Sequence, residues 1–222
     1  MLEQLIPSAS TYAGDIDWLI DLIAILTGFW FLVAQGMLFY LIFKYREENN
    51  PEAEYLTGKE KEVKRWVTIP HLLIILCDIV IIVAAVWVWR TVKQTLPEPD
   101  AEVRVVGQQW AWSFQHPGPD GELDTEDDIH TVDELHVEKG KTYHFDLESK
   151  DVIHSFSVPA FRLKQDAIPG RSITGWFEPT KTGTYDIQCA EICGIGHGLM
   201  VADLHVETPE EHAAWLEKTS GD

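Results

Sequence analysis

The sequence of 222 residues contains only three cysteines, and two of them, Cys189 and Cys193, lie four positions apart. This scarcity excludes a framework of several disulfides, as found in small secreted domains. The sequence has no Cys-x-x-Cys-His motif, so it carries no attachment site for a c-type haem. Basic residues are also few: 17 Lys and Arg stand against 36 Asp and Glu, which gives a formal net charge of −19. This sign disfavours nucleic acid as a partner.

Two long apolar runs occupy much of the N-terminal part, at about residues 16–43 and 67–89. Each exceeds the roughly 20 residues that a helix needs to span a bilayer. No Lys or Arg precedes Lys44, whereas a cleavable signal peptide begins with a basic segment. The sequence therefore predicts a transmembrane helical hairpin that anchors the protein in the lipid bilayer.

The loop between the two runs, residues 44–66, is rich in basic side chains: Lys44, Arg46, Lys59, Lys61, Lys64 and Arg65. Loops with this excess of positive charge stay on the cytoplasmic side. We therefore expect a multi-pass protein of the inner (cytoplasmic) membrane. Both termini, and all of the chain after the second span, are expected on the periplasmic or outer side.

The rest of the chain is typical of an all-β domain, because short alternating stretches are separated by glycine and proline. Roughly 110 residues with about seven strands predict a Greek-key sandwich. The strands are expected at residues 102–106, 131–137, 142–147, 152–158, 172–177, 183–188 and 200–206.

A short helix is predicted to close the chain. Thr208 is suited to cap it, Pro209 fits its first turn, and Glu211 completes a capping box. The expected division of the chain is an anchor at 1–96, a β domain at 97–207, and a C-terminal helix with its tail at 208–222.

Potential metal ligands are concentrated near the C-terminal end. Cys189, Cys193, His197 and Met200 bring two thiols, an imidazole and a thioether into twelve consecutive residues. A second histidine, His154, lies in a predicted strand upstream. Thiolate and thioether together favour copper, whereas zinc rarely takes methionine as a ligand.

Two other interpretations of the same residues stay open at this point. Cys189 and Cys193 could form a disulfide, because the predicted compartment is oxidising. Alternatively, the two cysteines with His154 and His197 could form a tetrahedral zinc site. Met200 belongs to neither arrangement, and its presence shifts the balance to copper.

Three segments resemble subunit II of the haem–copper oxidases, such as cytochrome c oxidase. They are residues 151–159 (Asp-Val-Ile-His-Ser-Phe-Ser-Val-Pro), 164–170 (Lys-Gln-Asp-Ala-Ile-Pro-Gly) and 184–193 (Thr-Tyr-Asp-Ile-Gln-Cys-Ala-Glu-Ile-Cys). The resemblance implies a cupredoxin fold for the outer domain and a binuclear copper centre, called CuA. It also implies a function: a soluble carrier such as cytochrome c delivers electrons, which pass to haem in the catalytic subunit I, where oxygen is reduced to water.

The resemblance also implies roles for individual residues. Cys189 and Cys193 are expected to bridge two coppers, with one imidazole each from His154 and His197. The remaining expected ligands are the sulfur of Met200 and the backbone carbonyl of Glu191. The carboxylate of Glu191 is expected to reach a magnesium ion at the boundary with the catalytic subunit.

The segment Gly-Gln-Gln-Trp-Ala-Trp-Ser, residues 107–113, places two tryptophans two positions apart. On a strand both rings would point to the same face, as they would for core packing. The resemblance implies instead that Trp110 is the exposed ring through which the donor's electron enters, while Trp112 packs near the copper loop.

Residues 94–222 hold 25 acidic and 9 basic residues, a balance of −16. This charge suits a basic donor, although a solvated surface explains it equally well.

Several polar residues in or near the spans are further candidates. Related oxidases place a proton-entry glutamate at the start of the second span, where this chain has Val63. Glu62, one position away, and His71 remain as candidates for that role. Polar side chains inside the spans are expected to face protein or water, because exposure to lipid is costly; they are Asp21, Gln35, His71 and Asp78. The acidic run at residues 120–128 could hold calcium, but it lacks EF-hand spacing and also suits a solvated loop.

Three other functions are considered. A haem–copper nitric oxide reductase would use the same electron site, and the altered sequence around Glu62 leaves this possibility open. A quinol oxidase subunit is disfavoured because the relatives of that class have lost the copper ligands. A copper chaperone would need exchangeable metal, but it would need neither two membrane spans nor a bridging pair of thiolates.

Overall fold

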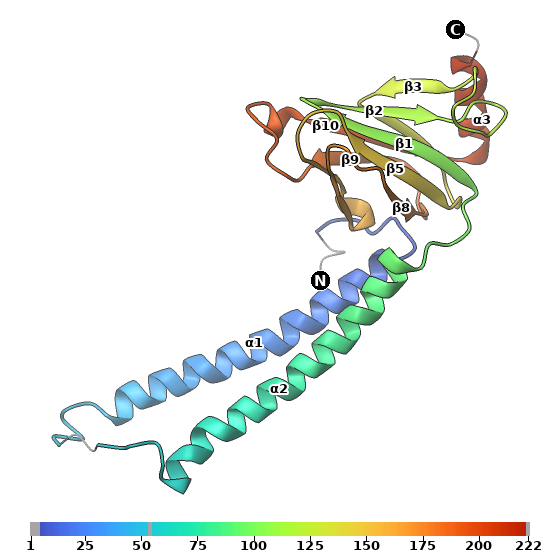
Figure 1. The fold of residues 1–222 in the computed structure, drawn as a ribbon. Coiled ribbons are helices and arrows are strands. Elements are labelled where there is room, and N and C mark those ends of the chain that lie inside the picture. Colours follow the sequence, from blue (N-terminus) through green and yellow to red (C-terminus); the bar gives the residue numbers. More distant parts are fainter. Residues whose placement is uncertain (1–4, 53–54, 221–222) are drawn as a thin grey trace. The chain divides into compact units, whose positions relative to one another are not determined.

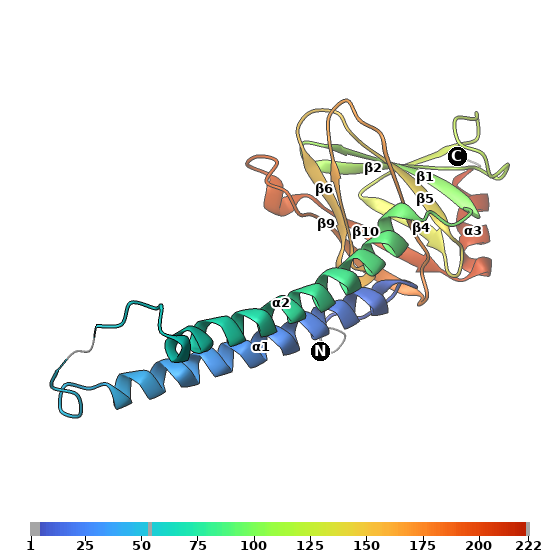
Figure 2. The ribbon, with the colours of Figure 1, turned by 60° about the horizontal axis from the view of Figure 1, so that its bottom comes forward.

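A computed structural model of the chain describes residues 5–52 and 55–220 (Figures 1 and 2). The chain forms two compact units. One is helical and comprises Trp18–Trp89, and the other comprises the chain up to Asp17 together with everything from Arg90 onward.

The helical unit contains two long helices, α1 (Ala13–Lys44) and α2 (Lys61–Trp89), and α2 continues into a π-helical turn at Arg90–Gln94. Both helices are long and apolar enough to cross a membrane. Their apolar side chains are mostly exposed, as expected for helices whose surroundings are lipid. Helix α2 begins earlier than the apolar run that predicted it, because polar residues from Lys61 onward form its first turns.

Contacts between the two helices include the third cysteine. The indole Nε1 of Trp30 donates to Cys77 Sγ at 3.4 Å, and the rings of Trp18 and Trp87 meet edge to face at 6.5 Å. Cys77 therefore serves as a packing residue, as a cysteine within an apolar helix usually does.

The second unit is a sandwich of two five-stranded sheets, with strand orders β3-β2-β1-β5-β8 and β4-β10-β9-β6-β7. Parallel pairing occurs between β1 and β5 and between β4 and β10, and the other neighbours are antiparallel. The strands are β1 (Ala101–Gln108), β2 (Ala111–His116), β3 (Ile129–Val132), β4 (Glu134–Glu138), β5 (Tyr143–Ser149), β6 (His154–Val158), β7 (Leu163–Ala167), β8 (Ile173–Phe177), β9 (Gly183–Cys189) and β10 (Val201–Glu207).

Alternating apolar residues build the core of the sandwich. In β1, Val103 and Val105 are buried while their neighbours are partly exposed, and β5 alternates in the same way. Between the sheets lie large aromatic side chains that are fully buried: Trp112, Phe114, Phe145, Phe156, Phe161 and Phe177. The predicted all-β sandwich is confirmed.

The strand prediction was wrong in three places. The single strand expected at residues 131–137 is two strands, β3 and β4, which belong to different sheets. They are separated at Asp133, whose φ of 58° lies in the left-handed region that breaks an extended strand. Strands β2 and β7 were not predicted. Strand β7, Leu-Lys-Gln-Asp-Ala, has little alternation, because its three central residues are all polar.

The N-terminal segment, residues 5–17, packs on the sandwich. The amide of Ala9 donates to the carbonyl of Ala160 at 2.9 Å, and the amide of Thr180 donates to the carbonyl of Ala9 at 2.8 Å. Arg162 holds Asp17 in a bidentate ion pair at 2.7 and 2.9 Å, and both side chains are largely buried. The sequence assigned residues 1–96 to the anchor, whereas the structural division falls at Asp17 and Arg90.

The closing helix, α3 (Pro209–Thr219), has the predicted capping box. Glu211 N donates to Thr208 Oγ1 at 3.2 Å, and Thr208 N donates to Glu211 Oε2 at 2.9 Å. Trp215 of this helix stacks on His136 and also contacts His116. Burial, reinforced by nearby histidines, lowers the pKa of His116 to about 3, so this core histidine stays neutral at physiological pH.

Candidate metal centre

One loop and one strand bring the predicted ligands together. Cys189 ends β9, and Cys193, His197 and Met200 follow in the loop that leads to β10. His154 begins β6, which pairs with β9 in the register Phe156↔Cys189. This pairing places a histidine that is 35 positions away in sequence beside the first cysteine.

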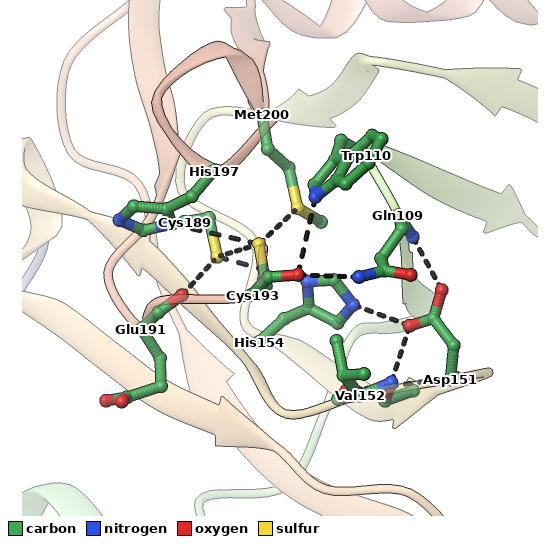
Figure 3. A network of polar contacts seen from close by, with 11 residues as sticks. Gln109, Trp110, Asp151, Val152, His154, Cys189, Glu191, Cys193, His197 and Met200 are labelled. Carbon is green, nitrogen blue, oxygen red and sulfur yellow. Dashed lines mark hydrogen bonds and ion pairs between the residues drawn. The ribbon is translucent and has the colours of Figure 1, made fainter. Parts of the chain in front are cut away.

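The two cysteine sulfurs form the middle of the cluster, at a separation of 3.7 Å (Figure 3). Cys189 Sγ lies 4.0 Å from His154 Nδ1 and 3.2 Å from the carbonyl oxygen of Glu191. Cys193 Sγ lies 3.7 Å from His197 Nδ1 and 3.9 Å from Met200 Sδ. The four other predicted donors therefore converge on the pair of sulfurs.

The donor atoms fit copper better than the alternatives. A disulfide has an S–S distance of about 2.05 Å, whereas Cys189 and Cys193 are free thiols with sulfurs 3.7 Å apart. Metal–thiolate bonds of about 2.3 Å would let one ion contact both sulfurs. A tetrahedral zinc ion uses four donors, and the thioether of Met200 is not among its usual ligands. Thiolate, thioether and imidazole together suit copper.

Most of the cluster is buried. Cys189, Cys193, Met200 and His154 are all buried, whereas His197 is partly exposed. Burial raises the pKa of the Cys193 thiol to about 11, and its contact with Cys189 adds to the shift. Without metal this thiol is protonated, so a metal ion has to displace the proton in order to bind.

His154 is also held from its other side. Its Nε2 lies 2.8 Å from the Oδ1 atom of Asp151, three residues earlier. Partial burial raises the pKa of the Asp151 carboxyl, but hydrogen bonds from His154 and from the backbone amides of Gln109 and Val152 outweigh burial and lower it overall. Sequence reasoning did not single out Asp151, although its place at the start of the segment that resembles the family was a usable signal.

Trp110 packs against the loop that follows β9, residues 190–200. It lies in the turn before β2, and its Nε1 is 3.4 Å from the carbonyl oxygen of Cys193. Its ring is 39% exposed, whereas Trp112, inside β2, is fully buried and contacts His154. The two rings therefore do not share a face, because the turn at Trp110 interrupts the strand alternation on which the core-packing interpretation relied.

The contact between Trp110 and the loop depends on a glycine. A methyl group on Gly196 would lie 2.4 Å from the indole of Trp110, although the backbone there, at φ −89°, accepts alanine. We expect Gly196→Ala to push the ring off the loop and to slow electron transfer from a soluble donor by roughly tenfold or more, as misplacement of a positioned group does. Stopped-flow oxidation of reduced carrier would measure this.

Gly198 in the same loop offers a matched control, because a methyl group there meets no atom within 4 Å. Gly198→Ala should leave the rate unchanged. Equal rates in both variants would show that the position of Trp110 does not affect electron transfer from the donor.

The other proposed roles concern the side chain of Glu191 and two residues of α2, Glu62 and His71. The carboxylate of Glu191 is exposed and points away from the cluster in Figure 3. Glu62 is exposed in the first turn of α2 and pairs with Arg65, and His71 is exposed in the same helix. Their suggested roles in magnesium binding and proton entry stay predictions.

The acidic loop at residues 120–128 shows no arrangement for calcium. Asp124 pairs with Arg104 at 2.7 Å, and Asp127 and Asp128 accept hydrogen bonds from Thr125. In the part of the chain that the structure describes, the only metal-ligating group of three or more such side chains is His154, Cys189 and Cys193.

The fold and this cluster define a class: a cupredoxin-like β-sandwich domain with a His-Cys-Cys cluster, in a chain that also has two helices of membrane-spanning length. The periplasmic domain of subunit II of cytochrome c oxidase, as a family, matches residues 128–206. An alternative cytochrome c oxidase subunit 2 of Bradyrhizobium diazoefficiens is 33% identical over 94% of this chain and 82% of its own length. The chain therefore belongs to the family of cytochrome c oxidase subunit 2.

Two further relatives agree with this membership. Cytochrome c oxidase subunit 2 of Cereibacter sphaeroides is 29% identical and covers 97% of this chain and 79% of its own length. The crystal structure of the periplasmic domain of subunit II of a Bradyrhizobium japonicum cytochrome oxidase superposes with a TM-score of 0.51 at 30% identity. That superposition covers 57% of this chain and 98% of the crystallised domain.

Proposed function

We propose that this chain is the electron-entry subunit of its oxidase and holds a binuclear copper centre, CuA. The observation that supports the proposal is the pair of free, buried sulfurs of Cys189 and Cys193, 3.7 Å apart. No other residues in the described ranges bring soft donors together in this way.

Each donor has a definite place in the proposed centre. Cys189 and Cys193 would hold the two coppers through their sulfurs, together with one imidazole each from His154 and His197. Met200 Sδ and the Glu191 carbonyl would complete the set. When bound, such a centre supplies one-electron redox chemistry whose potential is tuned by its axial ligands and surroundings.

The protein's own contribution is to hold these donors still and to exclude water. His154 and Cys189 sit on paired strands, so backbone hydrogen bonds fix their separation. Burial of the sulfurs limits access to them, which suits electron relay rather than bond making. Trp110, exposed on one side and in contact with Cys193 on the other, gives a donor such as cytochrome c a short path to the centre.

We also propose how the chain is oriented in the membrane and which subunit it contacts. The basic loop between α1 and α2 would lie in the cytoplasm, with the sandwich and both termini on the periplasmic side. Subunit I would bind against this chain, receive its electrons at haem and reduce oxygen. The Glu191 carboxylate would bind magnesium at that boundary.

Low-temperature EPR of the purified complex tests the proposal. One unpaired electron shared equally by two copper nuclei gives a seven-line hyperfine pattern, whereas a single copper gives four lines. We expect the seven-line pattern, and we expect the copper to resist removal by a chelator. A spectrum without copper, or rapid loss of metal as in a chaperone, would contradict the assignment.

A further inference from the structure

The carboxylate of Asp151 joins two parts of the site that are distant in sequence. Its Oδ1 atom lies 2.8 Å from His154 Nε2 and accepts the backbone amide of Val152 at 2.7 Å (Figure 3). Its Oδ2 atom accepts the backbone amide of Gln109 at 2.7 Å. One side chain therefore contacts both a proposed copper ligand and the residue before Trp110.

The contact with His154 determines which nitrogen faces the sulfurs. A carboxylate accepts hydrogen bonds, so the proton of the neutral imidazole lies on Nε2. The lone pair is then on Nδ1, the nitrogen that lies 4.0 Å from Cys189 Sγ. The ring has little freedom to turn, because it is fully buried and packs closely against Gly107. A methyl group added to Gly107 would lie only 3.1–3.2 Å from two carbon atoms of the ring.

The contact with Gln109 links Asp151 to Cys193. The side-chain amide of Gln109 donates to the carbonyl of Cys193 at 2.7 Å, and the indole of Trp110 approaches the same oxygen at 3.4 Å. The position of the Gln109–Trp110 segment therefore depends on Asp151 through the backbone and on Cys193 through two side chains.

We propose that Asp151 is a positioning residue that couples the His154 ligand to the Gln109–Trp110 segment, so that electron entry and the redox properties of the centre depend on one carboxylate. This inference rests on the proposed function. The negative charge beside His154 favours the more positive, oxidised centre and so lowers its reduction potential. The same carboxylate keeps Trp110 in place for the donor.

The test compares Asp151→Asn and Asp151→Ala with the unchanged protein in the full complex. Asparagine has one acceptor oxygen and one donor amide, so it can satisfy His154 or Gln109 but not both. Alanine satisfies neither. The control is Asp146→Asn, which removes an equal charge from β5, where the carboxylate accepts the Thr174 hydroxyl at 2.8 Å.

We expect both Asp151 variants to raise the reduction potential and to alter the copper hyperfine splitting. Copper affinity should fall by roughly 10- to 100-fold, the usual effect of removing the partner of a ligating histidine. The KM for the donor should rise in both variants, and Asp146→Asn should match the unchanged protein in every measurement. Loss of copper occupancy alone, with the potential and spectrum of the remaining centres unchanged, would overturn the inference.

Hydrogen exchange of the metal-free full chain keeps the test valid if a variant loads no copper. The amide of Gln109 should exchange faster in Asp151→Ala than in the control, because its acceptor is gone. Equal exchange would overturn the inference. If the unchanged protein itself lacked the seven-line spectrum, the proposed function would be refuted. Failure of the Asp151 inference can therefore be distinguished from failure of the proposed function.

Discussion

The complex with Cys193→Ser is expected to lose oxidation of its soluble carrier completely while it still assembles. Cys193 Sγ is the common neighbour of three other donor atoms, those of Cys189, His197 and Met200, at 3.7–3.9 Å. A serine hydroxyl is a hard, weakly acidic donor that cannot replace a thiolate bridge between soft metals. The side chain is almost the same size, so the buried loop should keep its fold.

Steady-state oxidation of reduced cytochrome c, together with EPR and copper analysis, would measure this effect. Cys77→Ala is the matched control, because that thiol lies in α2, where it accepts from the Trp30 indole at 3.4 Å. It should keep full activity. Normal turnover by Cys193→Ser would refute the relay role, and removal of copper by a strong chelator should reproduce the loss in the unchanged protein.

The variant Asp17→Asn is expected to release the N-terminal segment from the sandwich. Its carboxylate holds the Arg162 guanidinium at 2.7 and 2.9 Å, and the two side chains are only 13% and 7% exposed. Loss of one partner from such a pair leaves a buried charge uncompensated and costs about 3–5 kcal/mol. The carbonyls of Ile6 and Pro159 also accept from Arg162, and they would remain as partial compensation.

Hydrogen exchange of the Ala9 and Thr180 amides reports on this segment, because both bonds join it to the sandwich. Their exchange should accelerate by roughly a hundredfold to a few thousandfold, the factor that corresponds to a loss of about 3–5 kcal/mol. Lys141→Ala is the control, since it breaks a partly exposed pair with Glu138 at 2.8 Å, and pairs near the surface are worth about 1 kcal/mol or less. An effect of Asp17→Asn no larger than the control's would show that the pair does not hold the segment.

Local sequence patterns were sufficient for the two helices, the sandwich and the capping box of α3. Each depends on residues close together in the chain, such as Thr208 and Glu211. Prediction failed where a local pattern was overridden or weak. The left-handed turn at Asp133 divides one expected strand between two sheets, and the polar strand β7 exists because it pairs with β6 rather than because of its own alternation.

The sequence by itself determined the kinds of donor atoms and most of their spacing, because Cys189, Cys193, His197 and Met200 lie in one loop. It also determined the apolar length of the two helices, which depends on composition alone. Only the tertiary structure decided how His154 reaches Cys189, how Asp151 joins His154 to Gln109, and how Asp17 pairs with Arg162. Three of these contacts join residues that are 35, 42 and 145 positions apart. They depend on strand register and on packing between the sheets, which no short stretch of sequence specifies.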